Sequence, residues 1–180
     1  MTDDALFQQA LAFVWRPEND GQPYHVTPGD HGGATAWGVT YRACTAFETL
    51  HHMVNSTPTE FARLPRQAFE DFYRVAYWNV VQGDHLPPGI GLMLFDAAVM
   101  SGPVQAVQML QYCVDTDCDG ILGPITLAAV HSEAPAGLID DYLQARLDFY
   151  ESLRQPEFLD GWKARAARCH ALAVAAARAG

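Results

Sequence analysis

The chain has 180 residues, 49% hydrophobic and 18% charged, a composition typical of a globular protein that can build its own core. Its formal net charge of -10 argues against nucleic acid as a partner, because phosphates require basic surfaces, and against electrostatic adhesion to anionic membranes. No segment approaches the roughly 20 apolar residues of a membrane-spanning helix, so we expect no membrane insertion. The acidic start Met1-Thr2-Asp3-Asp4 is unlike a signal peptide, which predicts synthesis in the cytoplasm without one.

Helical periodicity is the first pattern along the chain. Apolar residues recur at helical spacing over residues 3–16, and Pro17 ends this segment. Between Glu18 and Thr40 the pattern changes to prolines and glycines around short apolar stretches, which predicts an irregular β-hairpin. Helical patterns return later in the chain, and they predict helices over residues 41–54, 66–79, 90–101, 103–113, 124–132, 136–155 and 161–178.

The sequence therefore predicts a mainly α fold with one small irregular β-hairpin. Pro87-Pro88-Gly89 interrupts the helical patterns near the middle of the chain. We expect this interruption to separate a catalytic lobe of residues 1–86 from a C-terminal helical lobe of residues 87–180, the two packed as one compact unit.

Two carboxylates, Glu18 and Asp30, lie in the segment that is predicted to form the hairpin. Glu18 stands where the helix ends, and Asp30 precedes Gly32-Gly33. Glycoside hydrolysis needs a carboxylic acid to protonate the leaving oxygen, and a second group to position water or stabilise a positive sugar ring. Such carboxylates can flank a bound polysaccharide, and glycines allow close approach of the sugar. The alternatives are a solvated loop carboxylate for Glu18 and local turn formation for Asp30.

The segment from Glu18 to Thr40 resembles the N-terminal signature of glycoside hydrolase family 108, whose members are muramidases. The match is dense over Asp30-His31-Gly32-Gly33-Ala34-Thr35-Ala36-Trp37-Gly38-Val39-Thr40. Upstream, Glu18-Asn19-Asp20-Gly21 stands where the family has Glu-Gly-Gly directly. Glu18 is therefore the natural counterpart of the family acid, with Asp20 as the alternative.

The resemblance continues in the correct order along nearly the whole chain. Phe72-Tyr73-Arg74 with Tyr77-Trp78 is similar to the family's Tyr-Arg-x-x-Tyr-Trp helix. Residues 95–102 are similar to its Phe-Asp-x-x-Val-Asn-Ser-Gly segment, with Met100 in place of Asn. Asp119-Gly120-Ile121-Leu122-Gly123-Pro124 resembles the second segment of these proteins, a predicted peptidoglycan-associated region, and Gly161-Trp162 with Arg165 resembles its closing Gly-Trp-x-x-Arg.

This resemblance implies a lysozyme-like fold with the hairpin beside an active-site cleft. It implies hydrolysis of the β-1,4 bond between N-acetylmuramic acid and N-acetylglucosamine. Glu18 would be the general acid, while Asp30 and the Thr35 hydroxyl would hold water or stabilise the oxocarbenium-like state, and inversion is favoured. The candidate substrate-binding residues are Tyr24, Trp37, Thr40 and Tyr77.

Several of these residues also have a structural interpretation. Tyr24 and Trp37 can stack on sugar rings or pack inward, and a core role is favoured for Tyr73, Tyr77 and Trp78. Arg74 and Asp96 are expected to form a buried pair between helices. The cysteines, which are Cys44, Cys113, Cys118 and Cys169, are expected to be reduced, with a Cys113–Cys118 pair as the alternative.

Two alternatives from other functional classes stay open. The first is a catalytically inactive peptidoglycan-binding or secretion-assisting protein on the same scaffold. The second is a calcium-binding module, because residues 115–120 imitate the first half of an EF-hand loop, although Thr126 stands where calcium needs a bidentate Glu. The histidines show no zinc spacing, so we expect neither a metal nor another cofactor.

The expected partner is the glycan strand of peptidoglycan, and we expect a monomer. Action in the periplasm or cell wall would require a holin or a secretion machinery for release. A prophage endolysin, a secreted effector and a wall-remodelling enzyme all fit this expectation.

Overall fold

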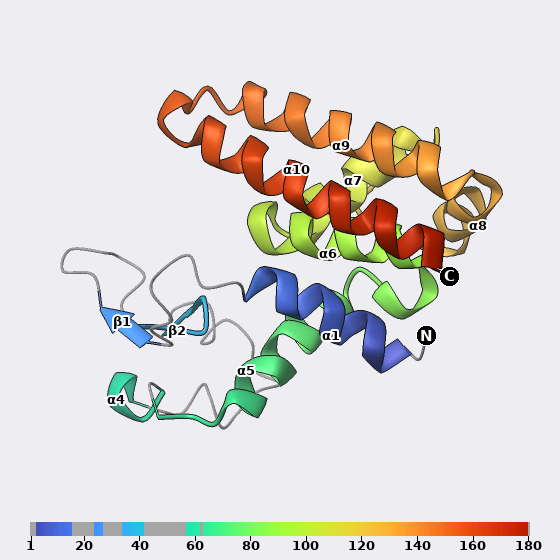
Figure 1. The fold of residues 1–180 in the computed structure, drawn as a ribbon. Helices are drawn as coiled ribbons and strands as arrows, with labels where there is room; N and C mark the ends of the chain where they lie inside the picture. The colour runs from blue at the N-terminus through green and yellow to red at the C-terminus, as the bar shows by residue number, and fades with distance from the viewer. Residues whose placement is uncertain (1–2, 16–23, 27–33, 42–56, 62, 180) are drawn as a thin grey trace. The chain divides into compact units, whose positions relative to one another are not determined.

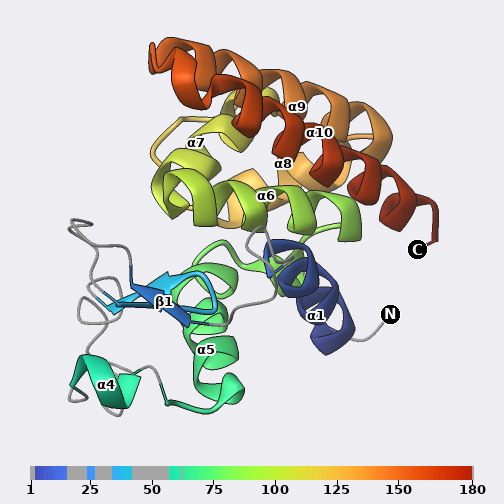
Figure 2. The ribbon, with the colours of Figure 1, turned by 60° about the vertical axis from the view of Figure 1, so that its left-hand side comes forward.

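The computed structural model describes residues 3–15, 24–26, 34–41, 57–61 and 63–179. Its contacts divide the chain into two compact units, one of residues 1–10 with 77–180 and the other of residues 11–76. The first division falls within helix α1 (Asp3–Val14). The described part is mainly helical with one small antiparallel sheet (Figures 1 and 2), which confirms the expected fold class.

The larger unit is built around helix α6 (Pro88–Ser101). Every residue from Gly89 to Ala98 is buried, because α6 packs against several other helices. A helix that is apolar on all sides belongs in the interior of a protein, and this one forms the core of the unit. Its neighbours are α7 (Pro103–Cys113), α9 (Pro135–Ser152) and α10 (Pro156–Ala179), of which α9 and α10 run side by side (Figure 1), and α8 (Pro124–Ser132) also belongs to the unit.

Prolines begin the helices of this unit. The first residues of α6 to α10 are all prolines, whose fixed φ suits the first helical turn and whose missing N–H costs nothing there. Pro156 is therefore the start of α10, and the prediction that the last helix begins at residue 161 was wrong. The other predicted helices of this unit are confirmed within a few residues at their ends.

A buried ion cluster connects α6 with α9 and α10. Asp96 is fully buried, as expected, but the predicted pair with Arg74 was wrong. Arg146 of α9 donates to one oxygen of Asp96 at 2.8 Å, and Arg165 of α10 donates to the other at 2.9 Å. The same Nη2 of Arg146 also donates to the Tyr150 hydroxyl at 2.9 Å. Two positive partners offset the cost of burying the carboxylate.

The described part of the smaller unit contains the sheet and the helices α4 (Pro58–Phe61) and α5 (Arg66–Tyr73). Strands β1 (Tyr24–Val26), β2 (Ala34–Ala36) and β3 (Val39–Thr40) form an antiparallel sheet in the order β1-β2-β3. Helix α4 begins with a capping box, in which Thr57 and Glu60 bond each other's backbone N–H groups, and α5 follows. The predicted helix over residues 41–54 lies almost wholly outside the described residues.

The predicted helix over residues 66–79 has two parts. Helix α5 ends at Tyr73 and passes into a π-helical turn, Arg74–Trp78, whose wider winding changes the register of the side chains. Tyr73 and Trp78 are both buried, which confirms their core role, whereas Tyr77 is half-buried. A short 3₁₀ turn, Gly83–His85, follows, and Asp84 accepts a 2.7 Å hydrogen bond from the Trp78 indole.

Within the described segments, none of the helices combines the length and hydropathy that crossing a bilayer requires.

Candidate active site

The central strand of the sheet brings predicted site residues together. Thr35 of β2 lies opposite Thr40 of β3 and, on its other side, opposite His25 of β1 in the backbone register. Opposite residues of an antiparallel pair project on the same face, so the side chains of Thr35 and Thr40 are neighbours. Thr35 is only 9% exposed, so its side chain is packed among neighbouring groups, which restricts its rotamers.

A two-residue turn, Trp37-Gly38, connects β2 and β3. Both residues have positive φ, 52° for Trp37 and 77° for Gly38, as a type I′ turn requires. Asn, Asp and Gly are the usual residues at the first position, and a bulky side chain there is strained. Backbone strain of this kind persists only where the surrounding structure holds it, and it is commonly found at functional sites.

The side chains around Trp37 hold it in this strained conformation. The Tyr73 hydroxyl donates a 3.2 Å hydrogen bond to the Trp37 carbonyl. The ring of Trp37 packs against that of Trp15, with 5.1 Å between centroids. The Arg66 guanidinium lies 5.0 Å from the Trp15 ring and 5.7 Å from the Trp37 ring, a cation–π arrangement. We call Trp15, Trp37, Arg66 and Tyr73 the Trp37 cluster.

Sequence reasoning missed Trp15 and Arg66 as members of this cluster. Trp15 directly follows α1 and lies three residues before Glu18 in the sequence. This closeness in sequence to the predicted acid could have identified Trp15 as a candidate site residue. Arg66 begins α5 after Pro65 and also forms a 2.9 Å ion pair with Glu70. Nothing in its local sequence connects it with the hairpin.

The remaining predicted site residues have different positions. Glu18 and Asp30 lie outside the described residues. Tyr24 lies in β1 with its backbone opposite Ala36. Tyr77 lies in the π-helical turn, at the first residue of that turn that belongs to the larger unit. For Trp37 the sequence allowed inward packing or stacking on a sugar ring. The structure is compatible with both, since the Trp37 ring packs on Trp15 and is only half-buried.

The loop that imitates a calcium site is held by protein groups. The Asp119 carboxylate accepts hydrogen bonds from the Gln111 amide at 2.7 Å and from the Ile121 N–H at 2.8 Å. These bonds lower the pKa of Asp119. Gln111 is buried, and its oxygen accepts a further bond from the Gly120 N–H at 2.8 Å. Across the described segments, no group of three His, Cys, Asp or Glu side chains is arranged to hold a metal ion.

Helices packed around a buried central helix, together with a small antiparallel sheet, define a mainly α, lysozyme-like protein. Residues 15–102 match the family model described as Glycosyl hydrolase 108, and residues 104–167 match the model described as Predicted Peptidoglycan domain. The structure is similar to that of SagA from Brucella abortus, with a TM-score of 0.83 and 36% sequence identity over 97% of each chain. No curated protein matches the chain.

The chain therefore belongs to the glycosyl hydrolase 108 family. It is a glycoside hydrolase of the lysozyme-like type that acts on peptidoglycan, and its second segment is a peptidoglycan domain.

Proposed function

We propose that the protein is an N-acetylmuramidase that hydrolyses the β-1,4 bond between N-acetylmuramic acid and N-acetylglucosamine. Glu18 is the general acid, and its proton passes to the glycosidic oxygen as that oxygen leaves the anomeric carbon. Asp30 and the Thr35 hydroxyl position the attacking water or stabilise the positive sugar ring. Attack from the opposite face of the ring inverts the configuration.

The observation that carries this proposal is the position of Thr35 within the segment that matches the glycosyl hydrolase model. Thr35 is nearly buried, and its side chain lies beside that of Thr40 on one face of the sheet. A threonine packed in this way loses little further side-chain freedom when its hydroxyl binds water or a sugar. The strained turn directly after β2 holds the end of the same strand.

Tyr24, Trp37, Thr40 and Tyr77 are the residues that we propose to contact the glycan. Trp37 is the best supported, because its half-exposed ring is backed by Trp15 and Arg66. Action on the wall takes place in the periplasm or cell wall after release by a holin or a secretion machinery, and the enzyme acts as a monomer.

Digestion of purified peptidoglycan by the wild type and by Glu18→Gln tests the proposal. Products are reduced and identified by mass spectrometry. Wild type is expected to release muropeptides that end in reduced muramic acid, and Glu18→Gln is expected to lose at least about 100-fold in rate, since general acid catalysis contributes about 10² to 10⁴. Glu133→Gln, an exposed carboxylate in the larger unit, is the matched control and should retain full activity.

Other results would contradict specific parts of the proposal. Undiminished product in Glu18→Gln would move the acid to Asp20 or Asp30. A folded wild type that binds peptidoglycan of several types but releases no product would instead support the inactive peptidoglycan-binding scaffold.

A further inference from the structure

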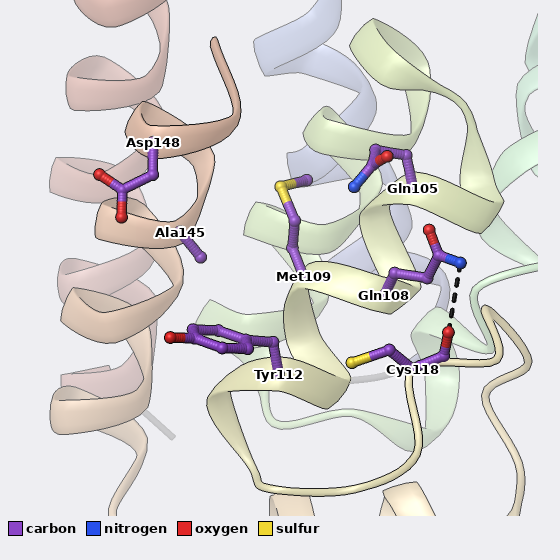
Figure 3. Close-up of a pocket in the computed structure, with 7 residues that line it drawn as sticks. All are labelled: Gln105, Gln108, Met109, Tyr112, Cys118, Ala145 and Asp148. Carbon is purple, nitrogen blue, oxygen red and sulfur yellow. Dashed lines mark hydrogen bonds between the residues drawn. The ribbon is translucent and has the colours of Figure 1, made fainter. Parts of the chain in front are cut away.

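A pocket of about 540 Å³ lies between α7 and α9 in the larger unit. Its volume is within the range of roughly 300–1,000 Å³ that small-molecule sites occupy. The residues that line it are Gln105, Gln108, Met109, Tyr112, Cys118, Ala145 and Asp148 (Figure 3). All of them fall within residues 104–167, which match the peptidoglycan domain. We call this the α7–α9 pocket.

The apolar part of the pocket comes from both helices. Met109 of α7 is 6% exposed and Ala145 of α9 is half-buried, so they form an apolar floor. Tyr112 is 75% exposed, and its ring extends from α7 towards α9 along one wall (Figure 3). Tyrosine presents a large apolar face at a low cost in conformational entropy, and such exposed aromatic side chains are common in recognition sites.

The polar part consists of two amides and a carboxylate. The Gln108 amide nitrogen donates to the Cys118 carbonyl at 3.2 Å, which holds that side chain and leaves its oxygen as an acceptor (Figure 3). Gln105 adds a second amide. Asp148 accepts a 2.7 Å bond from Gln144, and its second oxygen can accept from a ligand hydroxyl.

We propose that the α7–α9 pocket binds an N-acetylglucosamine unit of the glycan strand. One face of the sugar ring stacks on Tyr112, and the acetamido methyl group contacts Met109 and Ala145. The acetamido N–H and carbonyl pair with the Gln105 and Gln108 amides, and a ring hydroxyl donates to Asp148. In the strand, O3 of N-acetylmuramic acid carries the lactyl group and its stem peptide, so only N-acetylglucosamine offers a free O3 hydroxyl to Asp148. This difference selects N-acetylglucosamine.

This inference rests on the proposed function in taking the glycan strand as the ligand, and it adds a second point of contact with the wall. A second contact on the same polymer raises the effective affinity for long strands and adds little for fragments too short to reach it. Substitutions in the pocket should therefore impair action on intact peptidoglycan far more than action on short soluble muropeptides.

The direct test is a titration of the full chain with chitotriose, observed by NMR of methyl-labelled methionine. Glu18→Gln is used as the background so that the ligand stays intact. The Met109 methyl signal should shift, whereas Met93, which is fully buried in α6, is the internal reference and should not. Because Met109 lies in the floor of the α7–α9 pocket, its signal reports this pocket even if sugar also binds near the hairpin.

Sedimentation with purified peptidoglycan supplies the second readout. Tyr112→Ala should weaken binding by about tenfold, the loss expected for a residue that contributes slightly over 1 kcal/mol. Tyr112→Phe should keep most of the affinity, because the stacking face remains. Phe158→Ala is the matched control, since Phe158 is another exposed aromatic residue, in α10.

The outcomes separate this inference from the proposed function. Muropeptide release with an unmoved Met109 signal and unchanged binding by Tyr112→Ala would overturn the pocket assignment alone. A Met109 shift without any muropeptide release would support the pocket and contradict the muramidase. A shift with purified stem peptide but not with chitotriose would overturn the sugar as the ligand.

Discussion

The Tyr73 hydroxyl donates a hydrogen bond to the backbone carbonyl of Trp37, and this bond joins the end of α5 to the turn that follows β2. It holds a residue whose φ of 52° is unfavourable for a bulky side chain. Since Thr35 lies two residues before Trp37, the position of the proposed catalytic hydroxyl depends on this restraint. We expect both stability and activity to respond to changes here.

Tyr73→Phe should remove the hydrogen bond while keeping the buried ring. We expect a loss of about 1 kcal/mol in the free energy of unfolding, with a lower kcat because the β2–β3 turn is less restrained. Chemical denaturation and muropeptide release measure the two effects. Tyr112→Phe, at an exposed position, is the control and should leave stability unchanged. Equal stability of the two variants would show that the bond contributes nothing.

Gly38→Ala should destabilise the protein by about 1 kcal/mol or more. Gly38 has a φ of 77°, and an added Cβ would lie 3.0 Å from the Tyr73 hydroxyl. Gly161→Ala is the matched control, because Gly161 lies in α10 with open space around it. That change should stabilise the helix by up to about 1 kcal/mol. Thermal unfolding should show a lower Tm for Gly38→Ala and a higher Tm for Gly161→Ala than for wild type. A stabilised Gly38→Ala would contradict the turn assignment.

Asp96→Ala should cost about 3–5 kcal/mol, because it leaves the buried Arg146 without its carboxylate partner. The exposed pair between Lys163 and Glu151 is the comparison, and Glu151→Ala should cost less than about 1 kcal/mol. Urea denaturation gives both values. Similar costs at the two sites would mean that the buried cluster is not a principal support of the α6, α9 and α10 packing.

Asp119 should make the larger unit sensitive to acid. The Gln111 amide and the Ile121 N–H lower the pKa of its carboxyl in the folded protein. A lowered pKa stabilises the fold above the ordinary value of about 3.9, and this stabilisation is lost as the pH falls through the lowered pKa. Asp119→Asn should therefore show a smaller drop in Tm between pH 7 and pH 3 than wild type. Asp117→Asn removes a neighbouring exposed carboxylate of the same loop and is the control for the change in net charge.

The thiols should differ strongly in reactivity. Burial, with contributions from Asp141 and Cys118, raises the pKa of Cys113 to about 12, which lowers its thiolate fraction about a thousandfold relative to an ordinary thiol. Burial likewise raises the pKa of Cys169, whereas Cys118 is exposed. Brief alkylation of the native protein at pH 8, followed by peptide mass spectrometry, should label Cys118 well before Cys113 and Cys169. Early labelling of Cys169 would contradict its burial.

The sequence alone predicted most of the described helices and a small β element, and its resemblance to a family predicted the class of reaction. Helices such as α7 follow from the local recurrence of apolar residues and from prolines at first turns, which act within a few residues. The Gly-rich segment before Thr40 likewise predicted strands joined by a turn, although Trp37 is an unusual residue at that turn. The family motifs pointed to peptidoglycan, and the matches over residues 15–102 and 104–167 confirm that class.

Only the tertiary structure decided which distant side chains meet. The partners of Asp96 lie 50 and 69 residues further along the chain, and local periodicity cannot select them over Arg74. The contact of Arg66 with Trp37 and the α7–α9 pocket arise in the same way. Periodicity specifies which face of a helix is apolar, but the packing of whole elements determines which faces and charges come into contact.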